Sequence, residues 1–461
     1  MRIVILGGGF GGAYTAQHLE ALCKDRSDVE LVLVSRDNFL LMTPLLFEVC
    51  SGTLDANGCS VPIRAFLRTT RFVEATVQAI DLERRVVHLA AEEEKHDLGY
   101  DQLVLALGAM TNRVMIPGSE HAFMFKTLAD ALLLRNHMIE RFERADVEPD
   151  PERKRGQLKF VIIGGGLVGV ELFGELTAFV DEITPFYKHV NRDDVHFIML
   201  QAGDRIMPEI DAKLGAYGAR VLGGRRGAVI RTNTRVRAIE PGKVHLPELT
   251  IESETIILAA GIVPSPVVAA LPVEKDKHGH IVVDATMRCP SHPNVWALGD
   301  CARIPAPDGN PYPRLAQHAL REAKVLARNL HAVLSGRPLQ PFIYANLGMM
   351  GSLGHSRAFG QLLKLRVYGM LAWLVRRTYY LLQMPGWVRR LRIMIHWTFA
   401  LLFRPDIVKI SLDSEAALIF REEAAHKALE AGTSPAAAAA APSTPGAGPH
   451  AARSVGQERL S

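Results

Sequence analysis

The chain has 461 residues, of which 48% are hydrophobic and 22% charged, and its net charge is +4. Single hydrophobic cores stop growing at roughly 250–300 residues, so this length predicts two or three domains and excludes a small binding module. The charge is too evenly balanced for a nucleic-acid-binding surface, and we expect no nucleic-acid partner. The sequence enters an apolar run directly after Met1, without the regions of a signal peptide, which predicts a cytoplasmic protein.

The cysteines show neither a zinc-ligand spacing nor the pattern of a disulfide-bonded secreted protein. We therefore expect no metal site, and we predict reduced thiols in the interior. The five cysteines are Cys23, Cys50, Cys59, Cys289 and Cys301.

Two segments, residues 2–12 and 160–170, repeat one pattern: a short β-branched run, then glycines, then a helical periodicity. Short, continuous apolar runs are typical of strands in a parallel sheet covered on both faces. The fold class is therefore predicted to be α/β, with two Rossmann-like, doubly wound units. The charged stretch 146–156 is predicted to be a loop. Further strands are predicted at 29–34, 103–106, 195–200, 255–258 and 295–298.

Both segments contain the spacing Gly-x-Gly-x-x-Gly, in which glycines permit a tight turn, close approach of a pyrophosphate and close contact of helix and strand. The free N–H groups at the helix N-terminus favour the negative diphosphate. A single match is weak evidence, because a glycine turn can also simply join a strand to a helix. Two matches predict two dinucleotides, naturally a resident flavin and an exchangeable nicotinamide. The glycines are Gly7, Gly9, Gly12, Gly164, Gly166 and Gly169.

Neither unit ends its second strand with the carboxylate that normally binds the adenine ribose 2′-hydroxyl. The first unit has Ser35-Arg36-Asp37 at this place, and the second has Gln201-Ala202. Gln201 brings no charge that would repel a 2′-phosphate, so use of NADPH alongside NADH remains an open alternative. A simple hydrogen bond from Gln201 to the hydroxyl of NADH is an equal alternative.

Three further motifs resemble the pyridine nucleotide-disulfide oxidoreductase superfamily, whose flavoproteins bind two dinucleotides. Val295-Trp-Ala-Leu-Gly-Asp-Cys-Ala302 is similar to its second FAD motif, and the resemblance implies that Asp300 binds the flavin ribitol. Two more segments look like its crossover motifs, Leu103-Val-Leu-Ala-Leu-Gly-Ala109 and Thr255-Ile-Ile-Leu-Ala-Ala-Gly-Ile-Val-Pro264.

Within that superfamily, residues 1–410 are most similar to the type II NADH:quinone oxidoreductases, single-subunit NADH dehydrogenases that pump no protons. The resemblance implies hydride transfer from NAD(P)H to FAD and then two-electron reduction of a membrane quinone. Leu315 departs from the threonine that is usual in the quinone-pocket motif. The motifs are Asn38-Phe-Leu-Leu-Met-Thr-Pro-Leu-Leu46, Gly164-Gly-Gly-Leu-Val-Gly-Val-Glu-Leu-Phe-Gly-Glu175, Leu315-Ala-Gln-His-Ala319 and Asn346-Leu-Gly-Met-Met-Gly-Ser-Leu-Gly354.

The candidate catalytic residues are Glu171, Glu175 and Gln317. The two glutamates are four residues apart and share one helical face, where the resemblance implies that they shape the nicotinamide and quinone sites. A solvated helix face is the alternative. The candidate cofactor-binding residues are Gly7, Gly9, Phe10, Gly11, Gly12, Ser35, Arg36, Pro44, Leu45, Gly108, Gly164, Gly166, Gly169, Gln201, Gly261, Gly299, Asp300, Ala316 and Gln317.

The expected domains are an FAD domain in two parts, an NAD(P)H domain and a membrane-associating region. The alanine- and proline-rich composition of the C-terminal tail predicts disorder. The expected bounds are 1–112 and 285–345 for FAD, 113–284 for NAD(P)H, 346–412 for the membrane region and 425–461 for the tail.

No CxxC or CxxxxC pair occurs, which argues against a dithiol reductase, and only Cys50 and Cys59 are close in sequence. Sulfide:quinone oxidoreductases depend on cysteines near the second glycine turn and the C-terminal domain, where this chain has none. Such an enzyme remains an alternative function. A second alternative is a flavoprotein with low turnover whose redox state controls binding to a partner.

Residues 361–404 include Trp373, Trp387 and Trp397 and no acidic residue. Two short helices are predicted, and the apolar run 391–403 is shorter than the roughly 20 residues that span a bilayer. We expect peripheral binding at the cytoplasmic face of the cell membrane, helped by basic side chains and weakened by salt. The segment contains eight basic residues, Lys364, Arg366, Arg376, Arg377, Arg389, Arg390, Arg392 and Arg404.

The alternative for this segment is a dimer interface or packing on the flavin domain, because amphipathic helices commonly face cores or partners. The family resemblance independently implies a homodimer.

Overall fold

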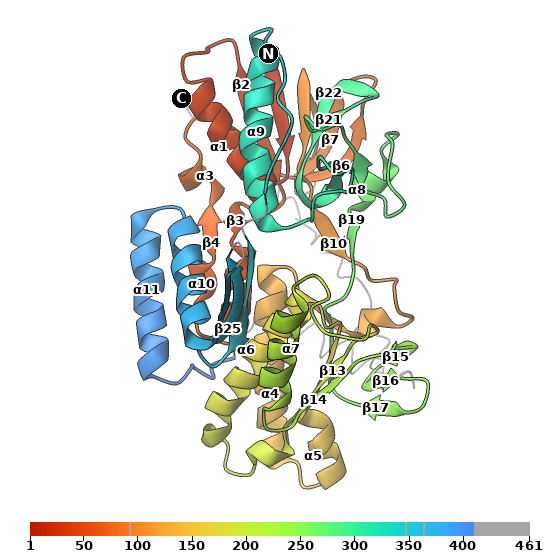
Figure 1. The fold of residues 1–461 in the computed structure, drawn as a ribbon, viewed down its shortest axis with the longest axis vertical. Coiled ribbons are helices and arrows are strands. Elements are labelled where there is room, and N and C mark those ends of the chain that lie inside the picture. The colour runs from red at the N-terminus through yellow and green to blue at the C-terminus, as the bar shows by residue number, and fades with distance from the viewer. Residues whose placement is uncertain (92–93, 346–347, 363–364, 410–461) are drawn as a thin grey trace, which may run out of the picture. The chain divides into compact units, whose positions relative to one another are not determined.

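The computed structural model describes residues 1–91, 94–345, 348–362 and 365–409 (Figure 1). The predicted tail at 425–461, Lys364 and the first two residues of the motif 346–354 lie outside the described residues. Met1–Val408 form one compact unit.

The first sheet has the strand order β21-β22-β9-β1-β2-β5, and its neighbours from β22 to β5 are parallel. β9 is buried along its whole length, as expected for a strand covered on both faces. Helices α1 (Phe10–Leu22) and α9 (Ala316–Leu334) pack against each other beside this sheet. The strands are β1 Arg2–Leu6, β2 Glu30–Ser35, β5 Arg71–Glu74, β9 Gln102–Leu105, β21 Arg288–Cys289 and β22 His292–Ala297.

The second sheet, with the order β11-β18-β12-β13-β14, is parallel throughout. The five strands predicted from the sequence all lie in these two sheets, and the α/β class is confirmed. The strands are β11 Phe123–Met124, β12 Lys159–Ile163, β13 His196–Leu200, β14 Ala228–Arg231 and β18 Thr255–Leu258, and the accompanying helices are α4 Leu128–Val147, α6 Leu167–Ile183 and α7 Ala212–Gly223.

The prediction of a loop at 146–156 is wrong, because a short helix, α5 (Pro151–Gln157), occupies most of it. The Asp150 carboxylate accepts hydrogen bonds from the N–H groups of Glu152 and Arg153, at 2.9 and 3.4 Å. Pro151 stands at the first helical position, where an N–H group is not needed. The charge and proline that suggested a loop therefore begin a helix.

Smaller sheets complete the two units. β10 (Ala109–Thr111) pairs antiparallel with β19 (Ile262–Pro264), which connects the ends of β9 and β18. Two antiparallel sheets consist of β6 Thr76–Asp81, β7 Val86–Ala91 and β8 Glu94–Gly99, and of β15 Ala238–Glu240, β16 Lys243–His245 and β17 Thr250–Glu252. The remaining short elements are β3 Phe39–Leu41, β4 Ser60–Pro62, β20 Ile281–Val282, β23 Ala302–Arg303, α2 Leu46–Cys50, α3 Ile63–Phe66 and α8 Pro266–Ala270.

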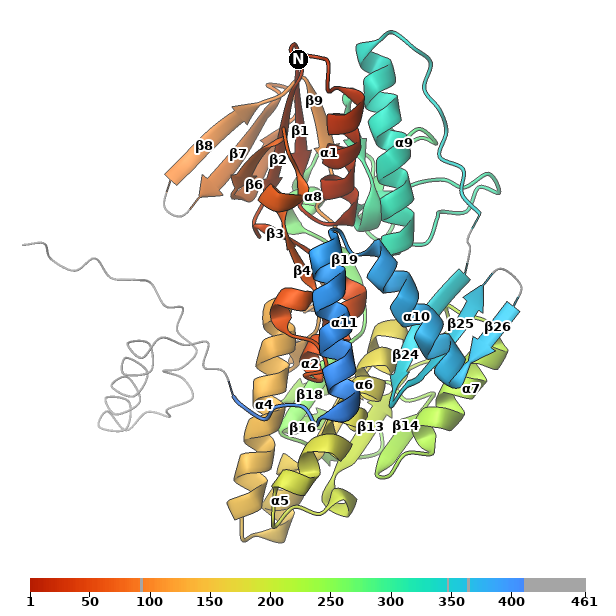
Figure 2. The ribbon, with the colours of Figure 1, turned by 90° about the vertical axis from the view of Figure 1, so that its left-hand side faces the viewer.

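The C-terminal region begins with an antiparallel sheet, β24 (Gly348–Gly354), β25 (Arg357–Leu362) and β26 (Leu365–Tyr368). Two helices follow, α10 (Gly369–Gln383) and α11 (Trp387–Leu402), which lie side by side in both views (Figures 1 and 2). The prediction of two short helices is confirmed. They begin later than residue 361, because the first residues of that segment belong to β25 and β26.

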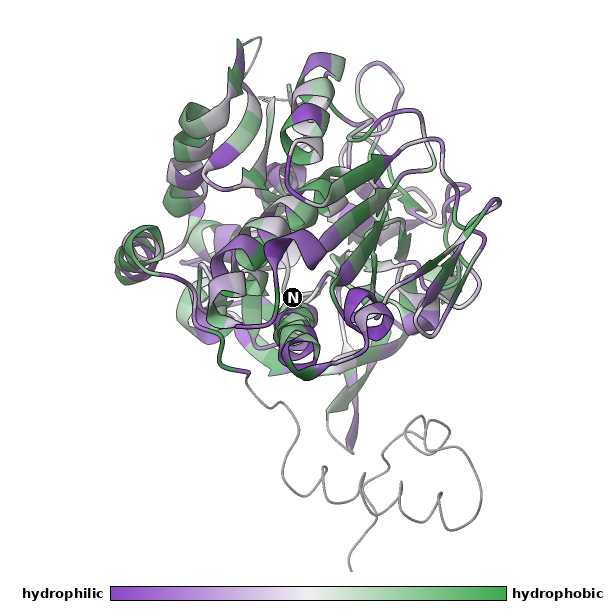
Figure 3. Cartoon of the chain, turned by 90° about the horizontal axis from the view of Figure 1, so that it is seen from below, coloured by the Kyte–Doolittle hydropathy of each residue, from purple (hydrophilic) through white to green (hydrophobic). Residues whose placement is uncertain are grey.

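Hydrophobic residues concentrate on the strands of the sheets, while hydrophilic residues dominate many of the outer loops (Figure 3). The prediction of buried cysteines is confirmed, since all five are buried and free.

One carboxylate is buried on α9. Glu322 is 3% exposed, and its Oε2 accepts a hydrogen bond of 2.8 Å from the backbone N–H of Gly299. Burial raises the pKa of Glu322 to about 7, and the N–H group of Gly299 only partly opposes that rise. Glu322 is therefore protonated at mildly acidic pH in the folded chain, where an unfolded chain ionises it.

Replacing Glu322 with Gln should make the free energy of unfolding change less with pH. A raised carboxyl pKa gives stability that is complete below the unfolded value and is lost as pH rises through about 7. The wild type should therefore lose roughly 1–3 kcal/mol relative to Glu322→Gln between about pH 4.5 and 7.5, measured by denaturant unfolding. Glu322→Leu leaves the Gly299 N–H unpaired and should be less stable at every pH. A constant difference between wild type and Glu322→Gln across this range contradicts the assignment.

Candidate functional site

The first glycine turn joins β1 to α1 with no room for side chains on its inner side. Gly7 has φ +111°, and a Cβ there would lie 2.2 Å from the Ala106 carbonyl oxygen; a Cβ at Gly12 would lie 1.9 Å from that of Gly7. A Cβ at Gly9 would meet no atom within 4 Å. Gly9 is also the N-cap of α1, and no side chain caps the helix. The turn therefore offers free N–H groups beside open space, which fits the diphosphate of a dinucleotide.

The second turn repeats this geometry between β12 and α6. Gly164 also has φ +111°, and a Cβ at Gly169 would lie 1.9 Å from the Gly164 carbonyl oxygen. Gly166 is the N-cap of α6, again without a side-chain cap. The space above it is narrower than at Gly9, because the Glu209 carboxylate lies 2.9 Å from the place of a Cβ on Gly166. Glu209 is an exposed side chain on a loop, so a nucleotide can displace it.

Gln201 is directed into the second turn. Its Oε1 accepts a 2.9 Å hydrogen bond from the Gly165 N–H, and its Nε2 donates to the Arg205 carbonyl at 3.2 Å. The side chain therefore stands beside the turn as a neutral group.

Three strands end in a glycine with left-handed backbone. Gly108, Gly261 and Gly299 follow β9, β18 and β22 with φ of +64°, +70° and +69°. The positive φ lets the chain turn sharply at the carboxyl edge of each sheet, where dinucleotides bind. Asp300 comes directly after Gly299, and its Oδ2 accepts a 3.4 Å hydrogen bond from the Lys126 ammonium group. Lys126 is not among the predicted site residues; its only local signal is its place before the capping box of Thr127 and Asp130.

Four candidate cofactor-binding residues lie at the end of β2 or soon after it, and their surroundings differ. The Ser35 side chain packs against Gly8, whose Cβ would lie 2.6 Å from the Ser35 Oγ. Arg36 is exposed and pairs with Asp37 at 3.2 Å, so the structure directs it toward solvent. Pro44 and Leu45 belong to the short helix η1 (Thr43–Leu45), and Leu45 is buried.

The start of α9 lies at the carboxyl edge of the first sheet, beside the turn that follows β22. A Cβ on Gly299 would lie 3.7 Å from the Ala319 Cβ, which places the first turn of α9, including Ala316, beside the Asp300 turn. The Gln317 Nε2 donates a 3.0 Å hydrogen bond to the Gly348 carbonyl at the start of β24. Gln317 therefore joins α9 to the C-terminal sheet.

Glu171 and Glu175 share one face of α6, as predicted, because both contact Ser352 of β24. The Glu171 Oε1 accepts from the Ser352 N–H at 2.7 Å, and the Glu175 Oε1 accepts from its hydroxyl at 2.6 Å. The side chains are 12% and 8% exposed, so the alternative of a solvated face is wrong. Burial raises the pKa of Glu171, although nearby Arg376 opposes the rise. Glu175 also accepts from the Ser51 hydroxyl at 3.3 Å.

Arg376 lies at the centre of the candidate site, where the sequence did not predict it. It was expected to face a membrane with Arg377, but their side chains are 1% and 11% exposed. Arg376 lies 3.1 Å from the Glu171 carboxylate and 3.1 Å from that of Glu48 on α2. Burial alone would lower the pKa of Arg376, but these two carboxylates raise it above its usual value. The guanidinium therefore stays charged.

The thiols near the site are unreactive. Burial raises the pKa of Cys50 above its usual range. It also raises the pKa of Cys59 and of Cys301, each to about 12. A thiolate at neutral pH is therefore negligible at these positions.

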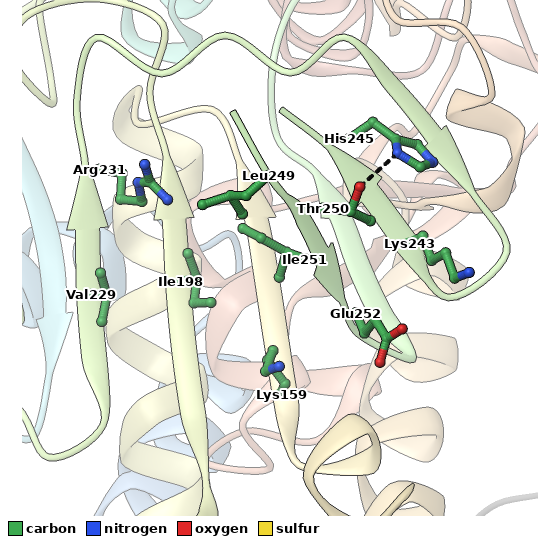
Figure 4. A pocket seen from close by; sticks show the side chains of 10 residues that line it. All are labelled: Lys159, Ile198, Val229, Arg231, Lys243, His245, Leu249, Thr250, Ile251 and Glu252. Atoms are coloured by element: carbon green, nitrogen blue, oxygen red, sulfur yellow. Dashed lines mark hydrogen bonds between the residues drawn. The ribbon is translucent and has the colours of Figure 1, made fainter. Parts of the chain in front are cut away.

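One cavity lies apart from the candidate residues. It has a volume of about 620 Å³ and lies between the second parallel sheet and the sheet β15–β17 (Figure 4). None of the candidate site residues lines it; its walls include Ile198, Val229 and Ile251, with Lys159 and Arg231 at its edges.

Relatives of known name share this fold. The family described as pyridine nucleotide-disulphide oxidoreductase matches residues 1–323. The chain is 29% identical over 421 residues to the type II NADH:quinone oxidoreductase Ndh of Mycobacterium tuberculosis, covering 87% of this chain and 88% of that protein. It is 30% identical to the mitochondrial internal alternative NAD(P)H-ubiquinone oxidoreductase A1 of Arabidopsis thaliana, covering 89% of this chain and 86% of that protein.

A further relative is the demethylphylloquinone reductase NdbB of Synechocystis, with 31% identity over 86% of this chain and 95% of that protein. Among solved structures, NDH2 from Plasmodium falciparum in complex with NADH shares the fold, with a TM-score of 0.83 and 20% identity. The superposition covers 88% of this chain and 99% of that one. The chain belongs to the pyridine nucleotide-disulphide oxidoreductase family and, within it, to the type II NADH:quinone oxidoreductases.

Proposed function

We propose that this protein is an FAD-dependent enzyme that oxidises NADH and reduces a quinone without pumping protons. The observation that carries the proposal is the pair of equivalent glycine turns, one on each parallel sheet, linked by β10 and β19. The names of the relatives, NADH:quinone and NAD(P)H-ubiquinone oxidoreductases, support the two substrates. In this proposal residues 1–112 and 285–345 bind FAD, residues 113–284 bind the nicotinamide nucleotide, and residues 346–412 meet the membrane.

Bound FAD would supply the redox chemistry, accepting a hydride from the nicotinamide and passing two electrons to the quinone. The protein's own contribution is to hold and orient the reactants. The turn at Gly9 binds the FAD diphosphate and Asp300 the ribitol, while the turn at Gly166 binds the nicotinamide nucleotide. Glu171 and Gln317, both anchored to β24, shape the space in which the two substrates reach the flavin. The buried thiols take no part, which disfavours the sulfide:quinone alternative.

The experiment that tests this function is stopped-flow absorbance on the purified protein. We expect yellow protein whose flavin absorbance is bleached rapidly by NADH and recovers rapidly when quinone is added. Slow reoxidation by every quinone tried would favour the regulatory flavoprotein instead. Protein that is colourless, and stays so after incubation with FAD, contradicts the proposal.

A matched pair of glycine variants sharpens this test. Gly9→Ala fills the open space of the turn without touching protein atoms, so the fold should persist while FAD affinity falls at least about tenfold. Gly156→Ala, on α5, also meets no atom within 4 Å and should leave FAD affinity unchanged. FAD dissociation followed by flavin fluorescence measures both.

We further propose that NADPH is a second electron donor, because the neutral Gln201 replaces the usual carboxylate. Gln201→Glu restores a negative charge beside the second turn and should raise the KM for NADPH at least about tenfold, by repulsion of the 2′-phosphate. The KM for NADH should change by less than about threefold. Gln201→Ala removes the amide without adding charge and should not discriminate between the two donors. Steady-state kinetics measure these effects, and a wild type inactive with NADPH refutes this part.

The membrane assignment is also a proposal, and it rests on an apolar stripe along α11. Among the described residues no helix is long and apolar enough to cross a bilayer. The outer face of α11 nevertheless exposes side chains at helical spacing, all between 43% and 72% exposed: Leu391, Met394, Ile395, Phe399 and Leu402. α10 adds Met370, Leu371, Leu374 and Leu382, all at least 49% exposed. Such a face is typical of helices that lie in a membrane interface.

The basic residues contribute less than the sequence suggested. Arg376 is buried, the Arg377 side chain is only 11% exposed, and Arg366 pairs with Asp211 at 3.0 Å. Arg389 donates to the carbonyls of Asn57 and Ser60, and Arg390 to those of Met384 and Leu382. Membrane binding should therefore depend mainly on apolar insertion, and salt should weaken it only modestly.

A matched leucine pair tests this surface. Leu391 on α11 and Leu249 in the turn between β16 and β17 are 44% and 41% exposed. Leu391→Asp should reduce binding to phosphatidylcholine vesicles at least about tenfold, because a charge replaces a leucine that is worth roughly 1.5–3 kcal/mol in an apolar phase. Leu249→Asp should bind like the wild type. Vesicle sedimentation measures both, and binding that requires anionic lipid and is released by salt would overturn the apolar account.

The cytoplasmic face of the cell membrane and a homodimer are the remaining parts of this proposal. The homodimer rests on the family resemblance.

A further inference from the structure

The two C-terminal helices both contact one buried carboxylate on α2. Glu48, on α2, is 2% exposed. Its Oε1 accepts a 3.1 Å hydrogen bond from the Arg376 Nη1 of α10, and its Oε2 accepts a 2.6 Å hydrogen bond from the Trp397 indole N–H of α11. One side chain therefore holds both helices at once.

A second arginine, Arg377, packs beside the contact between Glu48 and the two helices. The Arg377 guanidinium lies over the rings of Trp373 and Trp397, 4.0 and 4.7 Å from their centres, and 3.9 Å from the Glu48 carboxylate. Trp397 is 7% exposed, in contrast to the stripe on the outer side of α11. The inner face of the helix pair thus carries a buried charge among apolar side chains, and the outer face is apolar and exposed.

The same arginine that binds Glu48 also contacts both dinucleotide halves. The Arg376 Nη2 donates a 2.7 Å hydrogen bond to the Pro44 carbonyl and lies 3.1 Å from the Glu171 carboxylate. Pro44 is one of the candidate cofactor-binding residues, and Glu171 is the fifth residue of α6, the helix that follows the second glycine turn. A displacement of α10 or α11 would therefore be transmitted to η1 and α6 through rigid, buried contacts.

These contacts surround the place where α9, β24 and η1 converge. Gln317 at the start of α9 holds Gly348, β24 carries Ser352 beneath Glu171, and α10 packs on β24 and β25. In the proposed function this convergence lies on the side from which the quinone reaches the flavin.

We propose that Glu48 is a positioning residue for quinone reduction: by holding Arg376 and Trp397 it couples the placement of the membrane-facing helices to the shape of the quinone end of the flavin site. The inference rests on the proposed function. Glu48 touches neither cofactor nor substrate in this account, and it acts through Arg376 and the Pro44 backbone.

The test compares two tryptophan-to-phenylalanine variants of the holoenzyme. Trp397→Phe removes the indole donor to Glu48 and keeps an aromatic ring in place. Trp387→Phe makes the same exchange on the same helix, at a side chain that is 73% exposed. The substrate is a water-soluble quinone without a tail, so that altered membrane binding cannot change the result.

We expect Trp397→Phe to raise the KM for quinone at least about fivefold, while the rate of flavin bleaching by NADH stays within about twofold of wild type. The visible circular dichroism of the oxidised, bound flavin should change as well. Trp387→Phe should alter neither quantity. Glu48→Gln keeps an acceptor for the indole but removes the charge opposite Arg376, and it should give the same kinetic split if Trp397→Phe fails to fold.

Two results would overturn the inference. One is wild-type quinone kinetics and circular dichroism in both Trp397→Phe and Glu48→Gln. The other is an equal loss in bleaching by NADH and in quinone reduction, which indicates a merely structural role. If the wild type itself reduces no quinone, the proposed function fails, whereas the circular dichroism still decides whether Glu48 couples the helices to the flavin.

Discussion

In both parallel sheets the first helix starts so close to the first strand that a side chain in the turn would collide with backbone. The methyl group of an alanine at Gly12 or Gly169 would lie 1.9 Å from a carbonyl oxygen. This close approach aims the uncapped N–H groups of α1 and α6 at the edge of each sheet, where anions are stabilised. The left-handed glycines at the ends of β9, β18 and β22 clear the same edge. The proposed activity depends on this repeated backbone geometry before it depends on any reactive side chain.

The second organising feature is the group of buried charges between α2, α6 and α10. Glu48, Glu171 and Glu175 face Arg376 and Arg377, with hydroxyl groups and an indole completing the hydrogen bonds. Removing such charges from water costs several kcal/mol each, and the pairing largely offsets this cost without adding much stability. The group instead fixes one arrangement of helices, since any other would leave a charge buried without a partner. That is why the C-terminal helices have a defined position on the flavin half.

The sequence was most informative where structure is local. Glycine spacing and apolar runs predicted both turns and most strands of the two parallel sheets, because those patterns depend on neighbours in the chain. The four-residue spacing of Glu171 and Glu175 predicted their shared face for the same reason. Arg376 was misread because its partners, Glu48 and Glu171, are far away in sequence, and a basic residue in an apolar segment has the same pattern whether it faces lipid or a buried carboxylate. Lys126 was missed for a similar reason, and the helix α5 because a capping aspartate and proline also occur in loops.

The inward orientation of Arg389 and Arg390 has a consequence for how the protein meets a lipid surface. These side chains bind backbone carbonyls of the flavin half and of the turn between α10 and α11, so the helix pair is already folded in water. Segments that fold only on arrival spend roughly 1–2 kcal/mol of backbone entropy for every residue they order. Here that cost is met when the chain folds. In the proposed membrane attachment, binding can therefore be fast and reversible, because no further folding is needed at the bilayer.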